Sequence, residues 1–218
     1  MRPDGVAFKL YLIVDPMCSW CWGFSAVWRE FSRGLPRDVE VVDLMGGLAP
    51  DSTVPMDAST REYVQSAWRS VAETTGATFN FDFWRICEPR RSTYPACRAV
   101  IAAGMQTLDA RRAMYDAIQN AYFLDARNPS LSEELISISG EIGLDSTLFA
   151  DDLGSNEVAS RFAAERQACR NFGVTGFPTL IWSWQSADDE DASPRYGLLA
   201  AGYTNLDTLL SRWHSLTN

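Results

Sequence analysis

Two cysteines three positions apart, where a strand passes into a helix, constrain the fold of this chain more than any other feature. Residues 6–14 are rich in β-branched and aromatic side chains, which predicts a strand, and Pro16 ends it. Apolar residues then recur at helical spacing, and a second strand is predicted over residues 39–44. The chain therefore begins with a β-α-β unit that carries Cys18 and Cys21 at its first turn.

The middle of the chain, residues 48–171, shows helical periodicity throughout and predicts five or six helices. Candidate N-terminal caps are Ser59 or Thr60, Asp109 and Ser130. Strand character returns only after this block, which makes it an insertion between two parts of one α/β unit.

The C-terminal part of the chain predicts two more strands, over residues 179–184 and 196–201, and a helix over residues 205–216. The acidic run Asp188–Asp191 between these strands is typical of a solvated hairpin loop. The fold class is therefore α/β, with the helices of the middle segment inserted between the two halves of a sheet.

The cysteine pair has the spacing of a redox site. Residues three apart lie on one helix face, so the two sulfurs are close enough to form a disulfide. Cys18 falls at the helix N-terminus, where free backbone N–H groups and the helix dipole stabilise a thiolate. We expect Cys18 to attack disulfides and Cys21 to resolve the mixed disulfide. Ser19 and Trp20, between the cysteines, would line the site.

Charge and hydropathy exclude several classes of partner. The net charge of −9 disfavours nucleic acid and anionic membranes, and the apolar run 10–14 is too short to cross a bilayer. Asp4 stands where a secretion signal would carry basic residues, so we expect a cytoplasmic chain.

A zinc site would need four ligands, and a single Cys-x-x-Cys pair with one histidine does not provide them, so no metal and no cofactor is predicted.

Three segments carry the pattern of a known family: Asp15-Pro16-Met17-Cys18-Ser19-Trp20-Cys21-Trp22-Gly23-Phe24, Tyr94-Pro95-Ala96-Cys97-Arg98-Ala99 and Gly173-Val174-Thr175-Gly176-Phe177-Pro178-Thr179-Leu180. With the helical segment between them, they resemble the DsbA-like thioredoxin family, most closely its cytoplasmic FrnE-like branch of protein-disulfide isomerases and oxidoreductases. The resemblance implies a thioredoxin-like fold interrupted by a large α-helical insertion. Residues 1–47 and 172–218 would form the discontinuous thioredoxin-like domain, and residues 48–171 the helical insertion domain.

The same resemblance implies thiol-disulfide oxidoreductase or isomerase activity on disulfide-containing proteins or low-molecular-weight thiols. Pro178 would be the cis-proline beside the cysteines, and Phe177 would offer its backbone to a substrate strand. A groove for the substrate could be rimmed by Trp20, Trp22, Trp28, Phe24 and Phe83 or Trp84, although core packing is favoured for Trp28 and Phe24. Ser19-Trp20 replaces the proline and histidine of the periplasmic oxidase, which weakens the case for a strongly oxidising site. A reductase or isomerase role suits a reducing cytoplasm better.

Two other functions stay open. A glutathione-dependent isomerase or transferase, of the 2-hydroxychromene-2-carboxylate isomerase or kappa-class type, would use a serine, but Ser19 is out of register for that role. A chaperone-like module could bind partners through the Trp-rich surface without redox chemistry. Cys87 and Cys97 could form a second, regulatory pair, although buried free thiols are favoured. The oligomeric state is not predicted.

Overall fold

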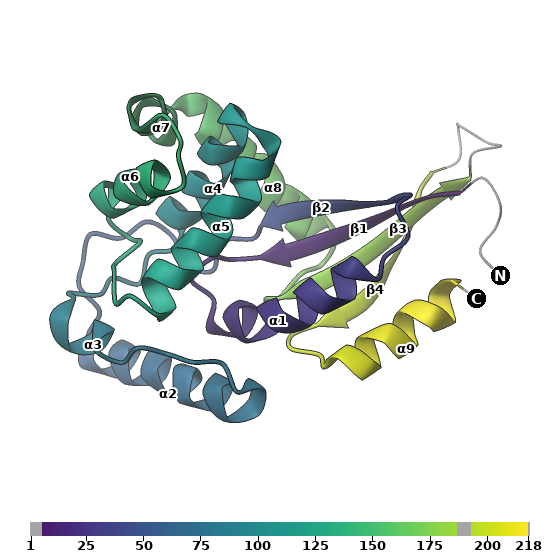
Figure 1. Cartoon of the computed structure of the whole chain (residues 1–218), viewed down its shortest axis with the longest axis horizontal. Coiled ribbons are helices and arrows are strands. Elements are labelled where there is room, and N and C mark those ends of the chain that lie inside the picture. The colour runs from purple at the N-terminus through teal and green to yellow at the C-terminus, as the bar shows by residue number, and fades with distance from the viewer. Residues whose placement is uncertain (1–5, 187–192, 218) are drawn as a thin grey trace.

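A four-stranded mixed sheet organises the computed structural model, which describes residues 6–186 and 193–217 (Figure 1). Its strands are β1 (Val6–Val14), β2 (Val39–Met45), β3 (Thr179–Ser186) and β4 (Arg195–Ala201). The strand order is β2-β1-β3-β4; β1 runs parallel to β2 and antiparallel to β3, and β3 is antiparallel to β4. The N-terminal strand is therefore central, and its C-terminal end leads directly into the cysteine pair.

Helices fill the chain between β2 and β3 in the described residues. The helices are α1 (Ser19–Arg33), α2 (Ala58–Thr75), α3 (Phe83–Ile86), α4 (Tyr94–Gln106), α5 (Leu108–Phe123), α6 (Ser132–Glu141), α7 (Ser146–Leu153), α8 (Asn156–Asn171) and α9 (Leu206–Thr217). Helices α2 to α8 lie between the two halves of the sheet in sequence, which confirms the predicted α/β class with a helical insertion. The division into domains at residues 47 and 172 stays a prediction.

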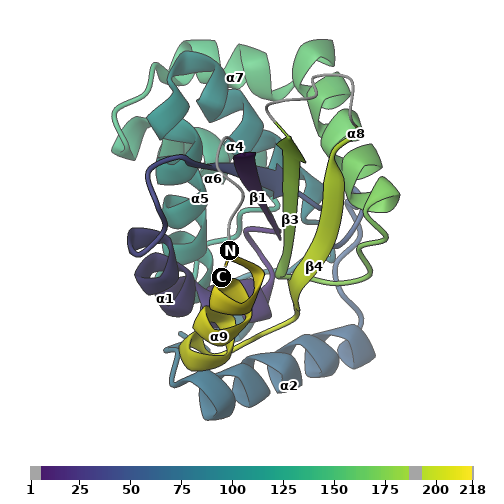
Figure 2. The ribbon, with the colours of Figure 1, turned by 90° about the vertical axis from the view of Figure 1, so that its right-hand side faces the viewer.

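Helices cover both faces of the sheet. Figure 2 shows α1 and α9 on one side and α8 on the other. On the first side, the ring of Trp213 from α9 lies 6.0 Å from Phe8 of β1 and 6.1 Å from Phe31 of α1, measured between centroids. On the second side, Cys169 of α8 packs against Ile181 and other buried residues of the strands. Apolar burial on both faces stabilises the central strand β1.

A cluster of aromatic rings holds α2, α3 and α5 together. Trp68 of α2 is fully buried, and the rings of Phe83 and Trp84 lie 5.8 and 5.0 Å from it. Phe83 and Trp84 are themselves only 1% and 7% exposed, so the prediction that one of them rims a substrate groove is wrong. Burying a large aromatic surface against Trp68 stabilises these side chains in the core.

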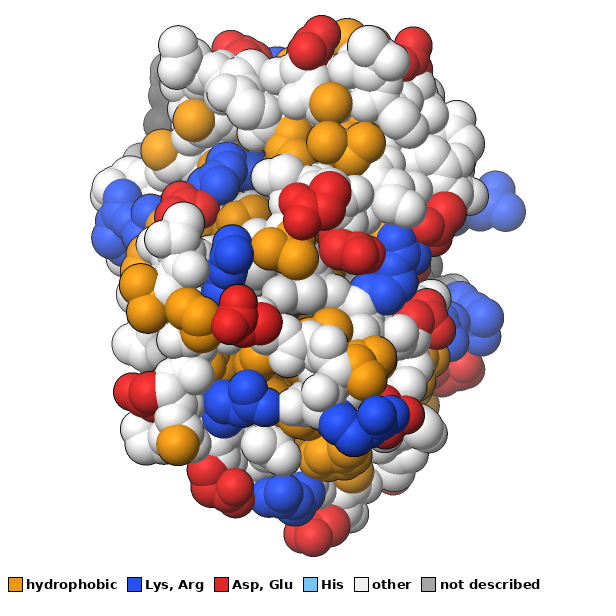
Figure 3. Space-filling view, turned by 90° about the vertical axis from the view of Figure 1, so that its left-hand side faces the viewer, with side chains coloured by type: hydrophobic (Ala, Val, Ile, Leu, Met, Phe, Trp, Pro, Cys, Tyr) orange, Lys and Arg blue, Asp and Glu red, His pale blue; other side chains and the backbone are white. Residues whose placement is uncertain are grey.

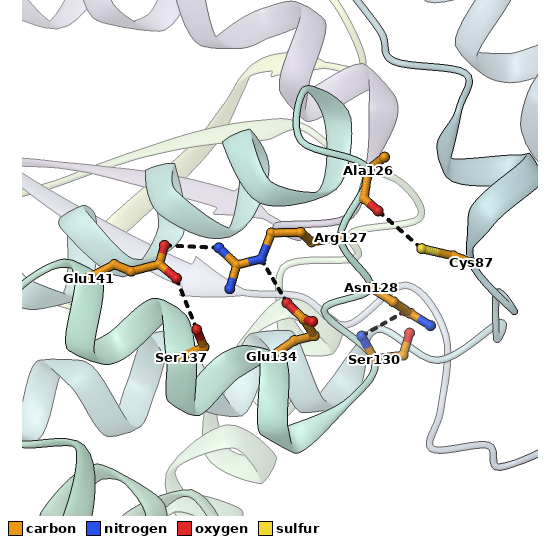
Figure 4. A network of polar contacts seen from close by, with 8 residues as sticks. All are labelled: Cys87, Ala126, Arg127, Asn128, Ser130, Glu134, Ser137 and Glu141. Atoms are coloured by element: carbon orange, nitrogen blue, oxygen red, sulfur yellow. Dashed lines mark hydrogen bonds and ion pairs between the residues drawn. The ribbon is translucent and has the colours of Figure 1, made fainter.

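Several charged side chains form ion pairs at the surface. On the face shown in Figure 3, acidic and basic groups are interspersed with small hydrophobic patches. Figure 4 shows Arg127, from the loop after α5, bridging two carboxylates of α6: Nε is 2.7 Å from Glu134 and Nη1 is 2.9 Å from Glu141. This bridge fastens the α5–α6 loop to the helix that follows it.

No helix in the described part of the chain is long and apolar enough to cross a membrane. The predicted hairpin loop Asp188–Asp191 lies outside the residues that the structure describes.

Candidate active site

Cys18 is the N-terminal cap of α1, and the local sequence explains its position. The Asp15 carboxylate accepts a 2.8 Å hydrogen bond from the backbone N–H of Met17, and the Asp15 carbonyl accepts a 3.1 Å bond from the N–H of Cys18. The backbone of Cys18 is extended, and its carbonyl accepts the bond from Trp22 N–H that opens the helix. The Cys18 sulfur therefore lies beside the unpaired N–H groups of the first turn.

The two cysteines lie 3.5 Å apart, and both are free thiols. Both are buried, with Cys18 6% and Cys21 2% exposed. Burial raises the pKa of the Cys21 thiol well above its ordinary value, and the neighbouring Cys18 raises it further. This short distance would allow the two thiols to be oxidised to one disulfide, and the raised pKa keeps Cys21 protonated at neutral pH.

A loop from the far end of the sequence closes over the pair. The Cys18 thiol lies 3.7 Å from the carbonyl oxygen of Phe177, and the Phe177–Pro178 peptide is cis. The Pro178 carbonyl accepts a 2.8 Å hydrogen bond from Gly202 N–H just beyond β4, and the Thr179 hydroxyl donates a 2.8 Å bond to Gly176. The fold therefore brings together Cys18, Cys21, Phe177 and Pro178, four of the predicted site residues.

The remaining predicted site residues point to different neighbours. Ser19 is the first residue of α1 and is buried. Trp20 is half-buried, with its ring 6.2 Å from Tyr203. Trp22 stacks on Phe123 at 5.5 Å, and its indole N–H donates a 3.0 Å bond to the Thr78 carbonyl. Trp22 thus ties α1 to the helical block, whereas Trp20 lies toward the C-terminal part of the chain.

A buried acid beneath the cysteines was not predicted as a site residue. Asp15 is fully buried and accepts hydrogen bonds from the hydroxyl of Thr93 at 2.6 Å, from Leu48 N–H at 2.7 Å and from the Cys97 thiol at 3.5 Å. Burial raises the pKa of Asp15, and these hydrogen bonds oppose that rise. The signal in the sequence was a carboxylate directly after the apolar run 10–14 that ends the strand.

The other three cysteines are free thiols, and each has different neighbours. Cys97 is fully buried and contacts Asp15, whereas Cys87 is half-buried and its thiol lies 3.1 Å from the Ala126 carbonyl. Cys169 is buried on α8, where desolvation raises its pKa to about 11. In the described residues no group of three or more histidine, cysteine or acidic side chains is arranged to hold a metal ion.

Comparison with known proteins places this geometry in a family. A model of the thioredoxin family matches residues 11–208. The ClpXP adapter protein SpxH of Halalkalibacterium halodurans is 25% identical over 84% of this chain. The chain spans only 60% of the length of that relative.

Solved structures share the fold over nearly the whole chain. A candidate protein disulfide isomerase from Nitrosomonas europaea superposes with a TM-score of 0.81 at 26% identity, covering 95% of this chain and 96% of the other. The cytosolic disulfide reductase DsbM of Pseudomonas aeruginosa superposes with a TM-score of 0.71 at 22% identity, covering 95% of this chain and 98% of the other. DsbM has also been solved with GSH. The chain belongs to the thioredoxin family and has the fold of its DsbA-like thiol-disulfide oxidoreductases.

Proposed function

We propose that this protein is a thiol-disulfide oxidoreductase in which Cys18 is the attacking thiol and Cys21 the resolving thiol. The observation that carries the proposal is the position of Cys18, which caps α1, lies 3.5 Å from Cys21 and faces the Phe177 carbonyl. In the first step the Cys18 thiolate bonds to one sulfur of a substrate disulfide, and the other sulfur leaves as a thiolate. Cys21 then loses its proton, attacks the Cys18 sulfur and releases the second thiolate.

The direction of the reaction follows from the surroundings of Cys18. Between the cysteines, Ser19 is buried and Trp20 packs toward Tyr203, so neither supplies a cationic partner for a thiolate. A thiolate with less stabilisation makes the reduced pair a better reductant. We therefore propose that the protein reduces or isomerises disulfides of proteins or small thiol compounds, in the cytoplasm.

A redox titration tests this function. The purified protein is equilibrated in buffers of varied ratio of reduced to oxidised glutathione, and its thiols are trapped and mapped by mass. We expect one reversible two-electron transition confined to Cys18 and Cys21, which Cys18→Ala abolishes. Cys21→Ala should accumulate a mixed disulfide on Cys18. The matched control, Cys169→Ala, should leave the midpoint unchanged, and a pair that stays reduced at every ratio contradicts the proposal.

A second function is binding of a protein partner without redox chemistry. The curated relative is named an adapter protein, and here a cavity of about 570 Å³ lies between α8 and the edge strand β4, where Tyr196 and Leu198 are exposed. An exposed strand edge beside an apolar cavity suits addition of a partner strand. Partner binding that survives Cys18→Ala and Cys21→Ala together would favour this function over the first.

A further inference from the structure

A small pocket borders the loop that closes over the cysteines. It has a volume of about 280 Å³, and its lining includes Gly46, Phe177, Arg166 and Arg170. Phe177 belongs to both places, because it lines the pocket and its carbonyl oxygen lies 3.7 Å from the Cys18 sulfur. A group held in this pocket would therefore contact the residue whose carbonyl faces the Cys18 thiol.

Two arginines of the pocket carry charge that no acid balances. None of the ion pairs in the described part of the chain uses Arg166 or Arg170. Arg170 donates to the amide oxygen of Gln167, which is neutral. The guanidinium of Arg166 lies 4.4 Å from the centroid of the Tyr94 ring, which orients the group and leaves its charge uncompensated.

The acid next to Arg166 in the sequence is already engaged elsewhere. Glu165 accepts 2.8 Å hydrogen bonds from Arg111 and a 2.7 Å bond from the backbone N–H of Met45. Arg166 and Arg170 both line this pocket and form no ion pair among the described residues, so the pocket presents two guanidinium groups to an anion.

Two adjacent glycines let the pocket walls approach closely. A Cβ on Gly46 would lie 2.0 Å from Cε1 of Phe177, and one on Gly47 would lie 2.8 Å from Tyr94 and 2.9 Å from Phe162. Gly47 also has a φ of +75°, in the region that favours glycine. Gly46 thus leaves room for the Phe177 ring, and Gly47 leaves room for the Tyr94 and Phe162 rings, over which the Arg166 guanidinium lies.

We propose that Arg166 and Arg170 form a subsite for the carboxylate of a low-molecular-weight disulfide whose sulfur is presented to Cys18. This inference rests on the proposed function. A planar guanidinium matches a carboxylate with two parallel hydrogen bonds, and the pocket has room for the end of a small thiol compound. The chemistry is the exchange above: Cys18 and Cys21 are oxidised to a disulfide, and the anionic disulfide is reduced to two thiols.

Disulfides of different charge test the subsite. The reduced protein is reacted in single turnovers with glutathione disulfide, neutral bis(2-hydroxyethyl) disulfide and cationic cystamine, and oxidation is followed by mass. Each variant is compared with the unmodified protein for the same disulfide, so the intrinsic reactivity of each compound cancels. We expect Arg166→Gln and Arg170→Gln each to slow the reaction with glutathione disulfide about tenfold. The reaction with the neutral disulfide should slow less than about twofold. The loss should shrink as salt increases.

The matched control is Arg161→Gln on the same helix, because Arg161 pairs with Glu157 at 2.7 Å and does not line the pocket. It should change none of the three rates. Arg166→Lys keeps the charge but loses the planar guanidinium, so it should retain only part of the preference for the anionic disulfide.

A non-reactive ligand separates the two proposals. S-methylglutathione cannot exchange disulfides, and calorimetry should detect its binding and the loss of binding in Arg166→Gln. If the arginine variants slow all three disulfides equally and leave this binding intact, the subsite is wrong while the redox function stands. If the unmodified protein reacts with none of the disulfides, the proposed function is wrong, and the subsite as a substrate site falls with it.

Discussion

The hydroxyl of Thr93 donates a 2.6 Å hydrogen bond to the buried carboxylate of Asp15, across 78 positions of sequence. Thr93 precedes α4, and Asp15 begins the turn between β1 and the cysteines, so this bond joins the helical block to the segment that carries the cysteine pair. The Thr93 oxygen also accepts bonds from the N–H groups of Leu48 at 3.1 Å and Ala49 at 3.0 Å. One hydroxyl thus connects three segments of the chain.

Replacing Thr93 by valine should destabilise the protein by about 1–3 kcal/mol, because a buried carboxylate loses a donor and the Ala49 N–H loses an acceptor. Thr93→Ser keeps the hydroxyl and should cost less than about 1 kcal/mol. Urea unfolding measures both. A larger loss for serine than for valine would mean that the methyl group, and not the hydrogen bonds, stabilises this junction.

The two active-site thiols should differ in their reaction with iodoacetamide. Burial raises the pKa of Cys21 well above its ordinary value of 9.0, so its thiolate forms only at high pH. Mass mapping of the reduced protein near pH 7.5 should find the label on Cys18 first. In Cys18→Ala, labelling of Cys21 should stay slow at neutral pH and increase only above pH 9.0. Faster labelling of Cys21 than of Cys18 at neutral pH would reverse the proposed roles.

An alanine at position 46 should disturb the loop over the cysteines. Its Cβ would lie 2.0 Å from the Phe177 ring, so the ring must turn away or the backbone must move. We expect a loss of about 1–3 kcal/mol in unfolding free energy and a slower reaction of Cys18 with small disulfides. Gly154→Ala is the control, since nothing lies within 4 Å of its added Cβ. Unchanged kinetics in a stable Gly46→Ala protein would separate Phe177 from the reaction.

The Arg127 bridge should give stability that depends on pH. The hydrogen bond from Arg127 holds the pKa of Glu141 below its ordinary value of 4.5, so the folded state favours the ionised carboxylate. The contribution of the ionised Glu141 to the free energy of unfolding is therefore present above pH 4.5. It disappears as the pH falls through the lowered pKa that Glu141 has in the folded state. Because Glu141 is half-exposed, Arg127→Gln should cost only about 0.5–1 kcal/mol at pH 7.

Thermal melting at pH 7 and at pH 3.5 checks this difference. The control is Arg85→Gln, whose pair with Asp82 is exposed on both sides and should contribute nothing measurable. A loss in Arg127→Gln that persists unchanged at pH 3.5 would show that the arginine acts through packing instead of charge.

Local patterns were sufficient to predict the elements that carry the cysteines. Residues 6–14 form a strand and α1 begins at Ser19 as predicted, because strand propensity, a proline stop and helical periodicity all act within a few residues. The placement of Phe177 and Pro178 beside Cys18 came from the family resemblance. No pattern within the chain relates positions 159 residues apart.

Caps and short helices were harder to predict, because several polar residues compete for each helix start. Asp57, not Ser59 or Thr60, caps α2, and Thr107, not Asp109, caps α5. Ser130 does not cap α6; its hydroxyl bonds to the Ser92 carbonyl instead. Helices α3 and α7 were not separately predicted, since four and eight residues give too little periodicity to recognise.

The Asp15 network could not be predicted from local sequence at all. Its partners Leu48, Thr93 and Cys97 belong to three separate segments that only the tertiary fold brings together. The sequence indicates that the strand ends before Pro16, and Asp15 does begin a turn there. The burial of Asp15, however, depends on contacts with the segment around α4, which begins about 80 positions later.

The sheet order β2-β1-β3-β4 also determines when the site can exist during synthesis. Cys18 and Cys21 leave the ribosome early, whereas β3, which completes the pairing of the central strand, follows only after α8. Until then the nascent chain presents two thiols without Phe177 above them, next to an unpaired edge of β1. Contacts of such long sequence separation form slowly, so the two thiols stay uncovered until the last part of the sheet has folded.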